Sequence, residues 1–199
     1  MDYAKQYRST IKSRPFFYRE MKKLAEFVVQ GFNESELQEQ IMEHNIFQVK
    51  SESRKREIAS TILTRFKALN HYLIKQLTTS DVQTCKIIVL YAIIKTDRLF
   101  FEFMFEVFHE KKIIQDFTIT DWDYNAFFEN KRQQSKRVSN WSEYTFYKLR
   151  QVYNRILFEA GLLENDEIKV PIINQDVLEY LRQLDDPAYI NVIVGGEPI

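Results

Sequence analysis

The chain has 199 residues, of which 45% are hydrophobic and 15% aromatic, and this is enough apolar material to bury a core without disulfides or metals. Only 4 Gly and 4 Pro occur, a composition typical of helical proteins that excludes an all-β fold rich in turns. The formal net charge is zero, and the longest apolar stretches, 87–94 and 99–108, are shorter than the roughly 20 residues of a spanning helix, so we expect no membrane anchor.

Capping residues and glycines predict a series of helices along the chain. Pro15 suits the first turn of the first helix, and Gly31 follows its end. Asn33 and Glu36 have the spacing of a capping box and open the second. Helices are expected over residues 15–30, 33–44, 51–69, 80–94, 97–111, 120–130, 142–160 and 174–184.

The C-terminal quarter contains a different pattern. Isoleucines and valines at 168–173 surround Pro171 and predict a short extended segment. The apolar residues 190–194 form a tail that is either an interaction segment or part of the core. We expect an all-α, compact multi-helix protein, with residues 1–75 as a basic N-terminal lobe and 76–199 as a helical body packed against it.

Charge alternates along the chain although it sums to zero. Residues 1–75 hold 14 basic and 9 acidic side chains, and residues 131–150 hold 6 and 1. Residues 76–130 hold 5 and 9, and residues 151–199 hold 3 and 9. The two basic segments are therefore the places to look for an anionic partner.

No pattern of catalytic residues is recognisable. The histidines, His44, His71 and His109, are far apart, and the sequence lacks a glycine-rich phosphate loop and a nucleophile elbow. Asp121 and Asp123 are expected to cap a helix. We predict a protein that is not an enzyme and needs no cofactor, metal or small-molecule substrate; an active site would require a pocket built from distant residues. The single Cys85, expected to be buried and reduced, favours the cytoplasm.

The third predicted helix carries the main candidate site. Ile58, Ile62, Phe66 and Leu69 fall on one stripe that should be buried. The opposite face has short hydroxyl side chains between long cations, an arrangement that suits phosphate contacts. The candidate contacts are Lys50, Ser53, Arg54, Arg56, Arg65 and Lys67. The order of the second and third helices resembles a helix-turn-helix, although the connection is long; the alternative is an ordinary solvated face.

The second basic segment contains Lys131, Arg132, Lys136 and Arg137 among polar residues. It is expected to be an exposed loop that either tracks a phosphate backbone or serves as a solvated linker.

Several segments, taken in order, resemble the BrxA family of BREX bacteriophage-defence loci. The matching segments are 7–9, 45–48, 51–56, 95–100, 148–149 and 156–163. The resemblance implies a helical, NusB-like, non-enzymatic protein that binds DNA, and it adds Lys55 to the candidate contacts. The expected partners are double-stranded DNA and other BREX proteins, and the alternative is an adaptor subunit that binds only proteins.

Overall fold

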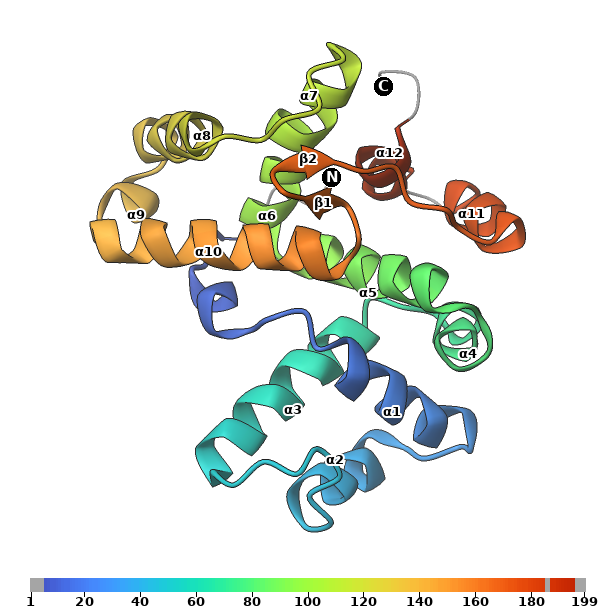
Figure 1. Cartoon of the computed structure of the whole chain (residues 1–199). Helices are drawn as coiled ribbons and strands as arrows, with labels where there is room; N and C mark the ends of the chain where they lie inside the picture. The colour runs from blue at the N-terminus through green and yellow to red at the C-terminus, as the bar shows by residue number, and fades with distance from the viewer. Residues whose placement is uncertain (1–5, 185–186, 196–199) are drawn as a thin grey trace.

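The computed structural model describes residues 6–184 and 187–195 and confirms an all-helical fold (Figure 1). In chain order the first elements are η1 (Thr10–Ser13), α1 (Tyr18–Val29), α2 (Glu34–Met42), α3 (Glu52–Phe66), α4 (His71–Thr79), α5 (Val82–Thr96) and α6 (Arg98–Phe103). They are followed by the π-helical turn η2 (Met104–His109), α7 (Glu110–Ile113), α8 (Asp121–Gln134), α9 (Lys136–Ser139) and α10 (Glu143–Glu159). The hairpin β1 (Leu163–Glu164) and β2 (Glu167–Ile168) precedes α11 (Gln175–Arg182) and α12 (Ala188–Val194).

Helix α5 forms the centre of the core. Every side chain from Ile87 to Ile94 is at most 1% exposed, because α3, α1, α4, α6 and α12 all pack against this helix. A helix that is apolar on all sides is stable only when it is enclosed in this way. The hydrophobic stretch 87–94 is therefore core. None of the helices in the described part of the chain combines the length and apolar composition needed to span a bilayer.

Helices α1, α2 and α3 form a lobe at one end of the molecule, below α10 in the view of Figure 1. The predicted capping box of Asn33 and Glu36 begins α2, and Ser51 caps α3 as expected. Helix α1 begins at Tyr18, three residues later than Pro15 predicts, because Phe17 is left-handed with φ 56°. The connection from α2 to α3 spans residues 43–51 and is longer than a tight helix-turn-helix turn.

Four features differ from the sequence-based expectations between residues 71 and 134. Helix α4 lies where no helix was predicted. Helix α5 begins at Val82, two residues later than the predicted range 80–94, because Asp81 is its cap. The helix expected over 97–111 contains the π-helical turn η2. Helix α8 continues to Gln134, so the basic segment expected as a loop is helical. The capping box of Thr120 and Asp123 is present.

The apolar tail is part of the core. Residues 188–194 form α12, in which Ile190 and Ile193 are fully buried, and this helix packs on α5 and η2. Of the extended segment predicted over 168–173, only Ile168 lies in a strand. The strands β1 and β2 have two residues each and pair antiparallel, with Leu163 opposite Ile168. Residues 185, 186 and 196–199 of the predicted C-terminal region lie outside the described residues.

Candidate nucleic-acid interface

One face of α3 is exposed and polar along its whole length. Its residues recur every three or four positions, which places them on one side of the helix. They are Ser53, Arg56, Ser60, Thr64 and Lys67, and the exposed Lys50 precedes them. We call these six residues the α3 stripe. It contains four of the predicted contacts, and the predicted buried stripe lies on the other side, where Ile58, Ile62, Phe66 and Leu69 are at most 8% exposed.

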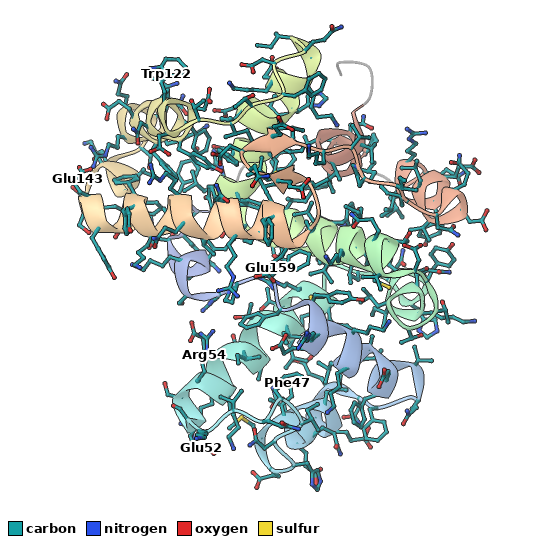
Figure 2. The ribbon with its side chains drawn as sticks, in the orientation of Figure 1. Phe47, Glu52, Arg54, Trp122, Glu143 and Glu159 are labelled. Atoms are coloured by element: carbon teal, nitrogen blue, oxygen red, sulfur yellow. The ribbon has the colours of Figure 1, made fainter. Side chains whose placement is uncertain are left out.

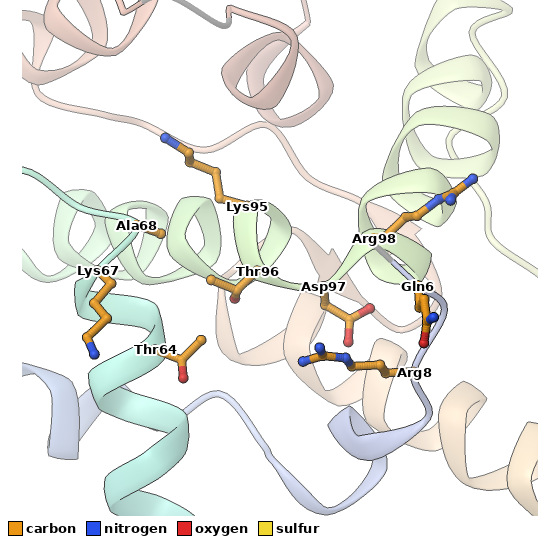
Figure 3. Close-up of a pocket in the computed structure, with 9 residues that line it drawn as sticks. All are labelled: Gln6, Arg8, Thr64, Lys67, Ala68, Lys95, Thr96, Asp97 and Arg98. Carbon is orange, nitrogen blue, oxygen red and sulfur yellow. The ribbon is translucent and has the colours of Figure 1, made fainter. Parts of the chain in front are cut away.

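Two hollows border the α3 stripe, and Thr64 and Lys67 line both of them. The first, of about 430 Å³, lies between α2 and α3 and includes Glu34. Glu34 accepts a hydrogen bond from Lys67 Nζ at 2.9 Å. The second, of about 440 Å³, lies between α3, the N-terminal segment and the α5–α6 junction, and includes Arg8 (Figure 3).

The four cations that line the second hollow do not all point into it. Lys95 and Arg98 direct their charged ends away from its centre (Figure 3). Lys95 Nζ lies 5.2 Å from the centroid of the Tyr91 ring, and Arg98 Nε donates to Glu102 at 2.7 Å. Arg8 and Lys67 are therefore the exposed cations on either side of this hollow.

Asp97 occupies the middle of the same hollow (Figure 3). Its carboxylate caps α6 by accepting a hydrogen bond from Phe100 N at 2.9 Å. Burial raises the pKa of the Asp97 carboxyl to about 6, although nearby Arg65 and Arg8 act in the opposite direction. A carboxylate at this position weakens the attraction of the hollow for a phosphate.

Arg65 and Lys55 are buried within the lobe, which corrects the prediction that their side chains are presented to DNA. Arg65 is 3% exposed, and its guanidinium donates to the carbonyls of Arg14, Pro15 and Phe16 at 3.1, 3.0 and 2.8 Å. Lys55 is 7% exposed and donates to Met42 O at 2.9 Å. Both cations satisfy backbone carbonyls that would otherwise lack partners.

The Arg54 side chain also makes structural contacts, although it is only half-buried at the edge of α3 (Figure 2). Its Nη1 donates to Ser13 O at 2.8 Å and pairs with Glu57 at 2.6 Å. Both Arg54 and Arg65 lie over the ring of Phe17. These two arginines hold residues 6–17, which we call the N-terminal strap, against the lobe.

The second basic segment is divided between structural and exposed cations. Lys131 is 2% exposed and pairs with Glu102 at 2.7 Å and Glu106 at 2.5 Å, which corrects the expectation that its side chain lies on an exposed loop. Arg132 pairs with Glu143 and lies over the Phe146 ring. Lys136 and Arg137 are exposed.

The N-terminal strap adds cations that the prediction missed. Arg137 Nη1 donates to Gln6 Oε1 at 2.7 Å, which places the strap beside α9. The strap contains Arg8, Lys12 and Arg14 and not one acidic residue, and Arg19 follows it in α1. The sequence shows these cations as part of the basic segment 1–75, but no helical pattern marks them as a separate surface.

The two acidic residues considered as catalytic candidates have structural roles. Asp123 caps α8, and Asp121 pairs with Arg150 at 2.7 Å. His109 is 5% exposed, and burial lowers its pKa. No group of three or more His, Cys, Asp or Glu residues within 6–184 and 187–195 is placed to hold a metal ion.

Comparison with known proteins gives a consistent family. The family model described as BrxA matches residues 5–185. A protein from Bacillus cereus (strain H3081.97), named BREX protein BrxA, is 54% identical over 193 residues, which cover 95% of this chain and 96% of that protein. The crystal structure of an uncharacterized protein from Magnetospirillum magneticum shares the fold with a TM-score of 0.82 and 21% identity, covering 96% of this chain and 100% of that one.

Proposed function

The chain belongs to the BrxA family, and from that premise we propose that it is a non-enzymatic component of a BREX phage-defence system that binds double-stranded DNA mainly through phosphate contacts. The name of the Bacillus cereus relative supports the defence role and suggests other BREX proteins as partners.

The α3 stripe is the observation that carries the DNA-binding proposal. From Ser53 to Lys67 the helix rises about 21 Å, which is enough to follow several phosphates along a groove. Its exposed cations are Lys50, Arg56 and Lys67, with hydroxyls of Ser53, Ser60 and Thr64 between them. Arg8 extends the surface across the neighbouring hollow. Cations neutralise the DNA backbone, and hydroxyl donors fix its position.

Acidic neighbours limit the strength of this surface. Glu34 pairs with Lys67, and the exposed residues of α2 include Glu36 and Glu39. Binding through so few cations is expected to be weak, tolerant of sequence and strongly dependent on salt. Lys136 and Arg137 would add affinity only if the duplex also reaches α9.

The test is the salt dependence of duplex binding. We expect Arg56→Ala with Lys67→Ala to weaken binding at low salt and to reduce the slope of log K against log [salt] by about 1.8, because each phosphate contact contributes about 0.9. Lys75→Ala is the matched control, since Lys75 is exposed on α4 outside the α3 stripe. An unchanged slope in the double variant, or an equal change in the control, would exclude this surface.

A protein-binding adaptor is the second candidate. Exposed aromatic residues favour it, because Trp122 on α8 is 74% exposed and Tyr144 on α10 is 64% exposed (Figure 2 for Trp122), and large aromatic side chains dominate protein interfaces. Co-purification with other BREX proteins that is lost in Trp122→Ala or Tyr144→Ala, in a protein that does not bind duplex DNA, would support the adaptor.

A further inference from the structure

Phe158 is an exposed aromatic residue whose position the fold does not explain. It is 62% exposed, whereas its neighbours Ile156, Leu157 and Ala160 are fully buried. Phe158 is the penultimate residue of α10, and the following Glu159 lies on the side of this helix that faces the lobe (Figure 2). Phe158 and Arg155 line two hollows. The ring therefore forms part of a ridge between them.

The hollow towards the lobe is cationic and aromatic. It has a volume of about 520 Å³ and is lined by residues 15–20, Lys86, Arg155, Phe158 and Glu159. Arg155 pairs with Glu159 at 2.5 Å. Arg19 and Lys86 make no ion pair within residues 6–184 and 187–195. Even with the carboxylate of Glu20 in the lining, two cations remain available beside an exposed ring.

The hollow on the other side of the ridge presents hydrogen-bonding groups. It has a volume of about 450 Å³, and its lining includes Gln151, Asn154, Tyr124 and Asp166. The Tyr124 hydroxyl is buried without a hydrogen-bond partner in the described part of the chain, and burial together with Asp166 raises its pKa. A buried hydroxyl without a partner favours binding of a ligand or a water whose oxygen or nitrogen atom accepts its hydrogen bond. Amides and a carboxylate next to an aromatic ring match the edge of a nucleobase.

We propose that the Phe158 ridge binds an unpaired nucleotide of nucleic acid, with the base stacked on Phe158 and the phosphate beside Arg19 and Lys86. An exposed ring stacks on a base only where the base is not already stacked in a duplex. Cations within the same hollow favour a nucleotide over an apolar protein segment. This site is separate from the α3 stripe and goes beyond the proposed function, since it recognises unpaired rather than duplex DNA.

The experiment compares a labelled oligo-dT with a blunt duplex by fluorescence anisotropy at low salt. Phe158→Ala is expected to weaken oligo-dT binding by roughly 5- to 100-fold, which is the loss expected from one stacked base. Phe158→Tyr should retain binding because the ring remains. Tyr144→Ala is the matched control, since it removes an exposed ring from the same helix. Duplex binding should be unchanged in all three variants.

The positions of the phosphates are tested separately. Arg19→Ala with Lys86→Ala is expected to reduce the salt slope for oligo-dT by about 1.4 without changing the slope for duplex, since each contact to a single strand contributes about 0.7. A 5-iodouracil oligonucleotide should cross-link to the peptide that contains Phe158.

Three results of the variant titrations would overturn the proposal. They are an oligo-dT affinity that Phe158→Ala leaves unchanged, an equal loss in Tyr144→Ala, and an equal loss of duplex binding in Phe158→Ala. Loss of co-purifying BREX proteins with unchanged oligo-dT binding would assign the ring to a protein interface and would overturn the proposal too. Duplex binding without oligo-dT binding refutes this site alone, and the reverse refutes only the proposed duplex function.

Discussion

The substitution Arg65→Ala tests whether the Arg65 side chain stabilises the fold or contacts DNA. The guanidinium donates three hydrogen bonds to the carbonyls of residues 14–16, and the bond to Phe16 O is fully buried. A hydrogen bond to a charged group stabilises a protein by about 1.5–3 kcal/mol, and half-buried ones contribute less because water replaces them. One buried and two half-buried bonds give an expected loss of about 3–5 kcal/mol in the free energy of unfolding. That is a large part of the stability of an ordinary domain.

Urea denaturation measures this loss directly. Arg65→Ala should lower the midpoint with little change in slope. Burial lowers the pKa of the guanidinium to about 9, so Arg65 remains charged at neutral pH and the assay at pH 7 probes the charged form. Arg56→Ala, which removes an exposed cation from the same helix, should change stability by no more than about 0.5 kcal/mol. A loss below about 1 kcal/mol in Arg65→Ala, accompanied by loss of duplex binding, would refute the structural assignment.

Three further predictions use the core and its buried charges. Lys131→Met should lower the free energy of unfolding by about 1–3 kcal/mol, because it removes the ammonium partner of Glu102 and Glu106 while Arg98 still pairs with Glu102; an unchanged urea midpoint would contradict this. Ile190→Ala should cost about 2–4 kcal/mol, since the side chain is fully buried, and a variant of native stability that loses BREX partners would instead make α12 an interface. Asp97→Asn should keep the cap of α6. Burial raises the folded pKa of Asp97 to about 6, above its ordinary value of 3.8, so the folded state binds the proton more tightly and stability falls as the pH rises from about 4 to 6. The variant should lack this fall. Stability measured across pH 4–7 checks the sign, and identical pH profiles for the two proteins would contradict it.

Local sequence signals predicted most of the helices. The capping box at Asn33, the start of the third predicted helix at Ser51 and the end of the helix predicted over 142–160 all depend on residues a few positions apart, and the structure confirms them. Helix α4 was missed because Asn70, its cap, follows α3 with almost no break in the chain. The apolar segment 190–194 was ambiguous, since only its contact with α5 shows that it is core.

The candidate site was harder to predict than the fold. A helical wheel separates the inner and outer faces of α3, and it placed Arg56 and Lys67 correctly on the exposed side. It could not show that the strap covers the flank where Arg65 lies, because that contact joins residues about 50 positions apart. Long side chains at a helix margin have two possible directions, and tertiary packing decides between them.

The position of α12 also affects how the protein folds during synthesis. Helix α5 is complete at Thr96, but the face that α12 covers stays open until the ribosome has made residues 188–194, about 90 residues later. At bacterial rates of roughly 5–20 residues per second, this interval lasts about 5–20 seconds. During that time an all-apolar helix is only partly enclosed, and hydrophobic surface exposed in this way makes a partly synthesised chain prone to aggregation.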